Sequence, residues 1–238
     1  ATSINVGMAL ADNFANTQLT PEQKIIYDLN PSIGEYLSNN VIVVPDPNYN
    51  PLLGGNSTMA AIDPQAEQFA NDLINLCIAN NSSVTIDNTI TAQNGLVFNN
   101  TNELQNHLNN FNNSVGTNVT TEDNGNNTKT SRFKFDLGMY AYLNVSVKQK
   151  LQATGQTYSI ENVSSSISGL TLAMEWEQND DDDVNISGNI ATVTFTGTLS
   201  LNCFVDGIGV FFSDNVTIIC AFNITTGELI SSQLNGLE

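Results

Sequence analysis

The sequence predicts a mainly β protein: an antiparallel sandwich or jelly-roll-like head, with a few short helices in the N-terminal half and an extended N-terminal strand. Two observations predict this fold class. After Ser131, apolar and polar residues alternate along most of the chain, as they do on strands with one buried face. The alternating stretches are separated by turns rich in Gly, Asn and Asp, which is typical of sandwiches and barrels.

Helical signals are confined to the N-terminal half. The motif Thr20-Pro21-Glu22 combines an N-cap with a proline in the first turn, and it predicts a short helix that ends near Asp28. Asp63-Pro64 opens the clearest helix, in which apolar residues follow i, i+3, i+4 spacing. Thr101 is the expected cap of a third helix. Between the helices we expect short strands at residues 41–44 and 83–91 and an exposed loop at 45–56.

Strands dominate the second half of the chain. Apolar residues occupy every second position from Phe133 to Val147, which predicts one long strand with a bend at Gly138. Residues 115–130 are polar and rich in Asn, Thr and Gly, and they predict a mobile loop that marks an internal boundary. Further strands are expected at residues 170–176, 193–205 and 216–224. We therefore expect an N-terminal tail at residues 1–12 and a single β-rich globular head at residues 13–238.

The composition limits the partners of the chain. It has 24 Asp and Glu against 6 Lys and Arg, which gives a formal net charge of -18. A polyanion of this kind repels phosphate, so we expect no nucleic-acid partner. No run of apolar residues approaches the roughly 18 that a membrane helix needs, so we expect no membrane span.

Asparagine is the most distinctive residue type, with 36 copies in the chain. Twelve of them begin Asn-x-Ser/Thr, the acceptor triplet for N-linked sugars. In the triplets that begin at Asn144, Asn162, Asn185, Asn215 and Asn223 the middle residue is Val or Ile, so on a strand the Asn faces solvent while the middle residue faces the core. This pattern favours an extracellular, cell-surface protein with covalent N-glycans, although an Asn-rich chain also forms triplets by chance. The acceptors are Asn56, Asn80, Asn81, Asn99, Asn112, Asn118, Asn126, Asn144, Asn162, Asn185, Asn215 and Asn223.

The chain has three cysteines. Cys203 and Cys220 occupy core-facing positions of the last two predicted strands, and a symmetric hairpin centred on residues 211–212 would place them opposite each other. We therefore expect a disulfide between them, the alternative being two small buried thiols side by side. Cys77 lies on the apolar stripe of the clearest helix and is expected to be an inert buried thiol.

Catalytic and metal-binding patterns are weak. Glu175, Glu177 and residues 180–183 form an acidic cluster that lacks the Gly and Glu positions of an EF-hand, which predicts a solvated acidic turn and leaves open whether it binds a cation. His107 stands alone on a polar helix face, with no second His or nearby Cys. We expect no enzyme, no cofactor and no metal site.

The N-terminal segment alternates strictly. Its large apolar residues stand between small or polar ones, and a polar spacer follows. An extended segment of this kind suits β-strand addition, in which alternate side chains fill a groove of a neighbouring molecule. The alternative is an ordinary first strand of the chain's own sheet. The expected donor residues are Ile4, Val6, Met8 and Leu10.

In residues 3–10, the twelve triplets and the scarcity of Lys and Arg, the sequence resembles the thread filament subunits on the surface of thermoacidophilic archaea. The resemblance implies a small secreted β-rich protein, heavily N-glycosylated, whose identical subunits join by donor-strand complementation. A type IV pilin is excluded, because residues 1–20 cannot form the long hydrophobic helix that such pilins need.

Three functions follow from these expectations. The leading one is a structural subunit of an extracellular filament, a pilus-like thread that serves adhesion and cell–cell contact. The second is a monomeric secreted glycoprotein binding module, such as a lectin-like adhesin or a viral or envelope coat protein. The third is a secreted hydrolase.

Overall fold

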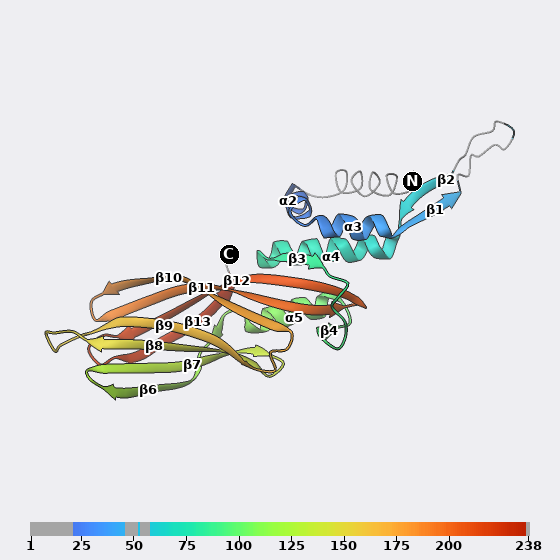
Figure 1. Cartoon of the computed structure of the whole chain (residues 1–238). Coiled ribbons are helices and arrows are strands. Elements are labelled where there is room, and N and C mark those ends of the chain that lie inside the picture. The colour runs from blue at the N-terminus through green and yellow to red at the C-terminus, as the bar shows by residue number, and fades with distance from the viewer. Residues whose placement is uncertain (1–20, 46–51, 53–57, 237–238) are drawn as a thin grey trace.

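The computed structural model describes residues 21–45, 52 and 58–236. The expected donor segment, the acceptor Asn56 and most of the expected loop at 45–56 lie outside these residues. Two β-sheets lie against each other, and helices extend from one end of them (Figure 1). The mainly β, sandwich-like fold with a few short helices is therefore confirmed.

The elements follow one another along the chain from the helical half to the β half. The helices are α2 (Pro21–Leu29), α3 (Pro31–Asn39), α4 (Pro64–Asn80) and α5 (Thr101–Phe111). The first strands are β1 (Val41–Pro45), β2 (Thr58–Ile62), β3 (Ser83–Ile86), β4 (Leu96–Phe98) and β5 (Ser114–Val115). The later strands are β6 (Thr117–Gly125), β7 (Thr128–Gly138), β8 (Ala141–Leu151), β9 (Tyr158–Gly169), β10 (Met174–Ser187), β11 (Ile190–Val205), β12 (Ile208–Asn223) and β13 (Glu228–Gly236).

The smaller sheet of the sandwich has the antiparallel order β6-β7-β8-β9. The larger sheet has the order β10-β11-β12-β13-β5, with β3 beside β12 and β4 parallel to β11. Alternate side chains of both sheets point between them and form one core, because central strands such as β8, β11 and β12 bury every second residue. Phe135 and Leu143 come from the smaller sheet, and Phe195, Phe212 and Phe222 from the larger, all at most 1% exposed.

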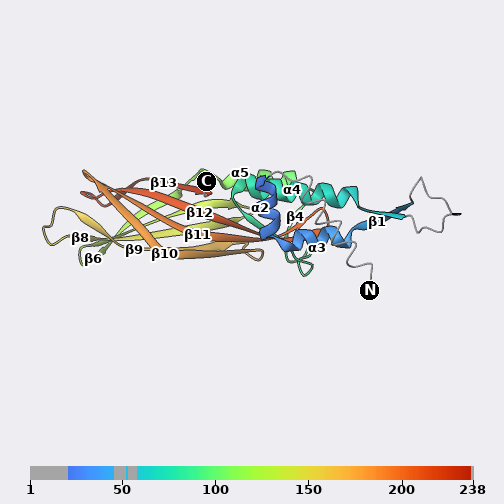
Figure 2. The ribbon, with the colours of Figure 1, turned by 90° about the horizontal axis from the view of Figure 1, so that it is seen from above.

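The helical half extends away from the sandwich. α4 packs against α2, α3 and α5 through a stripe that includes Phe69, Leu73 and Cys77, as its spacing predicts. The β1–β2 hairpin lies at the far end, so the molecule is elongated (Figure 2). Among the described residues, no helix combines the length and apolar character needed to cross a membrane.

The first helix ends close to the expected residue, since α2 stops at Leu29, and one expectation in the helical half needs correction. Pro31 then begins α3, a position that suits its fixed φ and missing N–H. The cap of α5 is Asn100 rather than Thr101: its side chain accepts a hydrogen bond from the backbone N–H of Glu103.

The predicted long strand through Gly138 is a hairpin. β7 ends at Gly138, β8 begins at Ala141, and the two turn residues Met139 and Tyr140 have φ of 51° and 61°. A two-residue turn pairs residue i with i+3 and would by itself change the phase of the alternation. The register shift between Asp136 and Gly138 adds one residue, so Phe135 lies opposite Leu143 and the apolar residues stay in phase on both strands. The unbroken alternation therefore conceals the turn.

The expected mobile loop at residues 115–130 is wrong. It contains β6, whose nine residues are all exposed, followed by a turn at Asn126-Asn127 and the start of β7. β5 pairs with the larger sheet and β6 with the smaller, so this segment carries the chain from one sheet to the other. An exposed edge strand buries no face, and its sequence shows no apolar alternation.

The last hairpin turns earlier than the sequence suggests. β11 and β12 are paired from Val205↔Ile208 outward, around a two-residue turn at Asp206-Gly207 with φ of 49° and 77°. Asp-Gly is a preferred pair for such a turn, because both residues must adopt positive φ. Residues 208–214, which were expected in the connection, belong to β12.

Candidate functional site: the seam between two sheet edges

The outer strands β9 and β10 form a seam between the two sheets. β9 is the last strand of the smaller sheet and β10 the first strand of the larger sheet, and they follow each other in the chain. They contact each other, yet no backbone ladder joins them in the described part of the chain. Each strand therefore presents an unladdered edge to the other, which is the feature that strand addition uses.

Side chains bridge this seam in place of a ladder. The indole Nε1 of Trp176 donates to the Ser165 Oγ at 2.8 Å, and the Ser165 hydroxyl donates to Gln178 Oε1. The Gln178 Nε2 donates to the backbone oxygen of Val163 at 3.1 Å. Trp176 and Gln178 come from β10, whereas Ser165 and Val163 come from β9, so three bonds hold the two edges together.

A glycine on the neighbouring strand makes room for the indole. A Cβ on Gly197 of β11 would lie 2.4 Å from the Trp176 ring, so this position accepts no side chain while the indole lies over it. β10 then bulges between Gln178 and Asp182. Beyond the bulge its apolar side chains lose their cover: Val184 is 39% and Ile186 58% exposed.

The acidic cluster lies on β10 and is not a turn as expected. Its bulged part lines a depression of about 300 Å³ in which Asp180 and Asp182 lie near Glu161 of β9. Among the described residues, no three His, Cys, Asp or Glu side chains are grouped closely enough to hold a metal ion. The acidic residues form a strand because Asp182 and Asp183 pair with Phe195 and Thr194 of β11. Composition alone does not predict this pairing.

The acceptor asparagines of the described chain all lie at the surface, exposed or half-buried. In the strand triplets, the middle residues Val145, Val163, Val216 and Ile224 are at most 9% exposed, as the alternation predicts. Two middle residues are exceptions: Ile186 lies on the uncovered end of β10, and Val119 lies on the exposed strand β6. Glycosylation itself stays a prediction.

The structure adds the orientation of each acceptor amide. Asn112 and Asn223 accept backbone N–H bonds at Oδ1, from Gly236 at 2.7 Å and Thr225 at 2.9 Å, so their Nδ2 atoms point elsewhere. Asn80 instead donates from Nδ2 to the Leu76 backbone oxygen at 2.8 Å and to Gln105 Oε1 at 2.9 Å. A sugar replaces one Nδ2 hydrogen, so the first two acceptors can carry it without losing these bonds.

Asn144 resembles Asn80 in this respect. Its Nδ2 donates to Ser168 Oγ at 2.7 Å and to the Ser166 backbone oxygen at 3.4 Å, both on β9. Asn215 accepts at Oδ1 from the Thr198 hydroxyl at 3.4 Å. The triplets of Asn144 and Asn215 have the same pattern in the sequence. Only the cross-strand hydrogen-bond partners of the two amides distinguish them.

The expected Cys203–Cys220 pairing is wrong. Cys203 lies opposite Val210 and Cys220 opposite Val193, because the hairpin turns at Asp206-Gly207. Cys220 is therefore ten residues further along β12 than Val210, roughly 33 Å at the rise of a strand, far beyond disulfide reach. These cysteines and Cys77 are buried free thiols, and burial raises the pKa of each to about 12.

His107 is not on a polar surface as expected. It is 8% exposed, its ring lies 5.5 Å from the Phe98 ring, and it fills the space beside Gly138. Burial lowers the pKa of this imidazole below its ordinary value. His107 therefore packs α5 against the β7–β8 turn.

Comparison with protein-family models, with curated proteins and with solved structures finds no match to this chain.

Proposed function

We propose that this protein is a structural subunit of an extracellular filament, a pilus-like thread assembled by donor-strand complementation and serving adhesion and cell–cell contact. One observation carries the proposal: β9 and β10 present two facing edges that share no backbone ladder within the described residues. The N-terminal segment of a second copy, with Ile4, Val6, Met8 and Leu10 on one face, supplies a strand with the alternation that such a seam requires.

The exchange is energetically reasonable. A strand entering the seam replaces three side-chain bonds, made by Trp176, Ser165 and Gln178, with a backbone ladder to one or both edges. Burying four apolar side chains at about 1.5–3 kcal/mol each contributes on the order of 6–12 kcal/mol before ordering costs. Donation from each copy to the next does not close on itself, and it therefore produces a filament.

The surface of the head suits an extracellular location. The acceptor triplets of the described chain present their Asn side chains outward, and N-glycans on them would cover the solvent-facing sides of both sheets. Attachment of sugars to these asparagines is part of the same proposal.

A point substitution tests the donor step. Val6→Asp places a charge on the apolar face of the segment and is expected to stop elongation, because burying a carboxylate without a partner is costly. Asn5→Asp is the matched control, since it adds the same charge to the opposite face of the segment and should leave filament length unchanged. Filament length is measured by electron microscopy. Filaments of normal length from Val6→Asp would overturn the donor mechanism.

A competition experiment tests the same step without altering the head. A synthetic peptide of residues 1–12 should shorten filaments of the full chain in proportion to its concentration, whereas the same peptide with Val6→Asp should not. If neither peptide acts and the purified chain stays monomeric at all concentrations, the protein is better described as a secreted binding module.

A further inference from the structure

The cations of this chain gather on one hairpin. Residues 128–151, which form β7, β8 and their turn, carry five of the six Lys and Arg residues and one carboxylate, Asp136. The rest of the chain carries 23 carboxylates and one cation, Lys24 of α2. Such a distribution makes the molecule strongly asymmetric in charge.

Four of these cations share one surface. They point away from the core, because their neighbours Phe133, Phe135, Val145 and Val147 are buried between the sheets. We call this surface the cationic face, and it consists of Arg132, Lys134, Lys148 and Lys150.

The fifth cation has a structural partner. The Nζ of Lys129 donates to the Thr226 backbone oxygen at 2.7 Å and lies 5.1 Å from the centre of the Tyr158 ring. It ties β7 to the loop after β12 and is not part of the cationic face.

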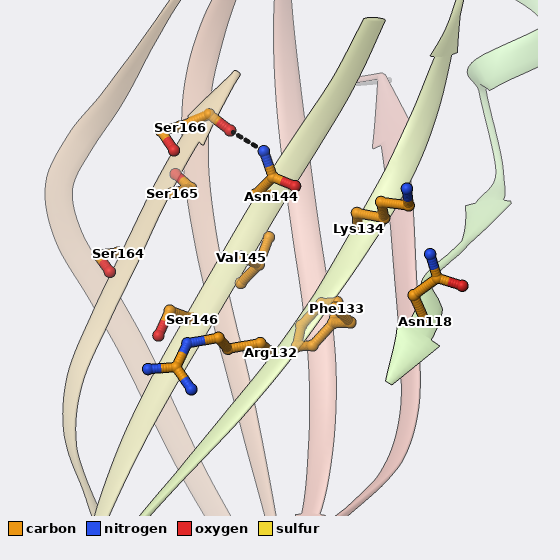
Figure 3. Close-up of a pocket in the computed structure, with 10 residues that line it drawn as sticks. All are labelled: Asn118, Arg132, Phe133, Lys134, Asn144, Val145, Ser146, Ser164, Ser165 and Ser166. Atoms are coloured by element: carbon orange, nitrogen blue, oxygen red, sulfur yellow. Dashed lines mark hydrogen bonds between the residues drawn. The ribbon is translucent and has the colours of Figure 1, made fainter. Parts of the chain in front are cut away.

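Two residues of the cationic face, Arg132 and Lys134, line a depression of about 510 Å³ (Figure 3). Arg132 and Lys134 lie along β7 at one side, and the amide of Asn144 with the hydroxyls of β9 lies at the other. Phe133 and Val145 contribute to the lining from below. The depression therefore combines positive charge, hydrogen-bonding groups and some apolar surface.

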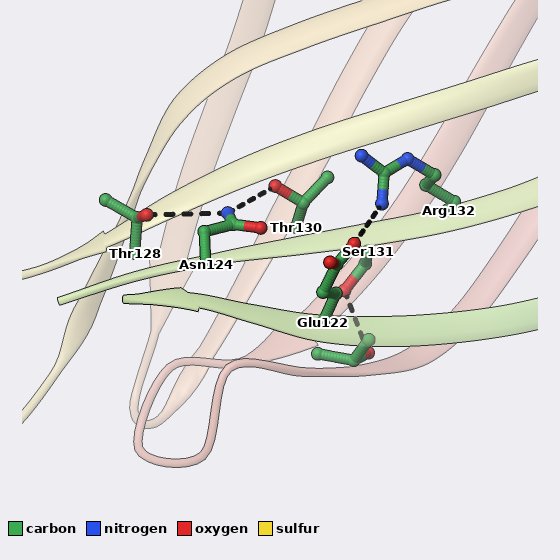
Figure 4. A network of polar contacts seen from close by, with 7 residues as sticks. Glu122, Asn124, Thr128, Thr130, Ser131 and Arg132 are labelled. Carbon is green, nitrogen blue, oxygen red and sulfur yellow. Dashed lines mark hydrogen bonds and ion pairs between the residues drawn. The ribbon is translucent and has the colours of Figure 1, made fainter. Parts of the chain in front are cut away.

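Polar contacts between β6 and β7 hold the rim of this depression (Figure 4). Arg132 Nη1 pairs with Glu122 Oε2 at 2.9 Å, and Asn124 Nδ2 donates to Thr130 Oγ1 at 2.7 Å. Lys148 pairs with Glu161 at 3.2 Å, whereas the Nζ of Lys134 lies 4.1 Å from the centre of the Tyr142 ring. The charged groups among them are exposed or half-buried, so their charge reaches an approaching partner.

A complementary surface is present on the same chain. β10 carries six carboxylates within ten residues, and beyond its bulge the apolar side chains of Val184 and Ile186 are also exposed. We call this segment the acidic strand; its carboxylates are Glu175, Glu177, Asp180, Asp181, Asp182 and Asp183. An extended edge that offers both carboxylates and apolar side chains matches the chemistry of the depression.

We propose that the cationic face binds the acidic strand of a second copy of this chain. Two molecules of charge -18 repel each other in most orientations. The approach that relieves this repulsion places the cationic hairpin of one copy against an acidic surface of the other, and the acidic strand is the densest such surface. The contact uses none of residues 1–12, so it goes beyond the filament proposal, while it shares β10 with the seam that the donor segment is proposed to enter.

The test uses the full chain carrying Val6→Asp, so that elongation through the donor segment is removed. Sedimentation velocity should show self-association at 50 mM NaCl that weakens about tenfold at 500 mM, because salt screens exposed charges. Lys134→Glu with Lys150→Glu should abolish this association, and so should Asp181→Lys with Asp183→Lys.

Mixing the two charge-reversed proteins provides the decisive result. Each alone presents like charges at the contact, whereas the mixture restores opposite charges on both surfaces and should associate again. Glu22→Lys with Glu35→Lys is the control of matched charge for the acidic-strand variant, and Lys24→Glu reverses a cation outside the cationic face; these residues lie on α2 or α3, and both controls are expected to leave association unchanged.

Two outcomes would overturn the proposal: a Val6→Asp chain that is monomeric at 50 mM NaCl, or charge-reversed proteins that associate as the parent does. Binding of an acidic polysaccharide to the same monomeric chain would assign the face to a different partner. Filament length tests the donor mechanism separately from the contact between the cationic face and the acidic strand. A negative result for one proposal therefore does not decide the other.

Discussion

Trp176 of β10 donates its indole N–H to the hydroxyl of Ser165 on β9, across a distance of 2.8 Å and between two strands that belong to different sheets. The same hydroxyl donates to Gln178, so Ser165 links two side chains of β10. In the described structure these side-chain bonds join β9 and β10, whereas adjacent strands of one continuous sheet would be joined by a ladder of backbone hydrogen bonds. The stability of the seam should therefore depend on a few side chains.

The first prediction concerns this indole. Trp176→Phe keeps an aromatic ring and removes the N–H, and it should lower the free energy of unfolding by about 1 kcal/mol, the usual net contribution of one hydrogen bond. Trp176→Ala also removes the half-buried ring and should cost more than Trp176→Phe, though less than the roughly 3–5 kcal/mol of a fully buried tryptophan. Urea unfolding followed by circular dichroism measures both, since Trp176 is the single tryptophan and its fluorescence is lost. Equal losses for the two variants would contradict the assigned role of the N–H.

The second prediction concerns the pH dependence of stability. Burial raises the pKa of Asp214 on β12 to about 6. A hydrogen bond donated by the Ser82 hydroxyl lowers this pKa and so offsets part of the rise. Because the folded pKa lies above the unfolded one, the contribution of this group is fully favourable below about pH 4 and is lost as the pH rises through 6. At pH 7 the buried charge of Asp214 lowers the free energy of unfolding by about 3 kcal/mol, relative to a carboxyl group whose pKa does not change on folding.

Asp214→Asn tests this dependence directly. The amide has no charge to bury and its oxygen can still accept from Ser82, so the variant should gain stability relative to the parent as the pH rises from 4 to 7. Unfolding curves collected at several pH values measure the difference. Parallel pH profiles for the two proteins would show that Asp214 is not the group responsible.

The third prediction concerns the occupancy of the acceptor triplets. Asn112 and Asn223 should carry N-glycans, because backbone donors hold their Oδ1 atoms and leave Nδ2 outside those bonds. Asn80 and Asn144 should be less occupied, since a sugar on Nδ2 removes a hydrogen that these residues use. Peptide mass spectrometry of native protein measures each site. An intact mass of 25.6 kDa would remove the whole glycan hypothesis.

The fourth prediction concerns the thiols. Native protein should react slowly with iodoacetamide, because Cys77, Cys203 and Cys220 are buried and their pKa values are raised to about 12. Denatured protein should take up three labels without any reductant. Uptake of a single label under those conditions would mean that two cysteines are bridged, contrary to the register of β11 and β12.

The sequence by itself determined the class of most elements. The stripe that contains Phe69 and Leu73 specified α4, and period-two alternation specified β11 and much of β7, β8 and β12, because burial of one face imposes that period. It also identified the outward acceptors on strands, such as Asn162 and Asn215, since their Val neighbours must face the core.

Only the tertiary structure decided where the chain turns and which residues lie opposite each other on paired strands. A register shift beside the turn at Met139-Tyr140 keeps the alternation in phase, so the sequence pattern shows no break there. The turn at Asp206-Gly207 changes the buried positions from odd to even numbers, and its place in the chain separates Cys203 from Cys220. β6 was not predicted, because every residue on it is exposed and its sequence therefore shows no apolar alternation. The seam bonds of Trp176 and the amide orientation of Asn144 depend on pairing partners more than ten residues away, and no local pattern encodes such contacts.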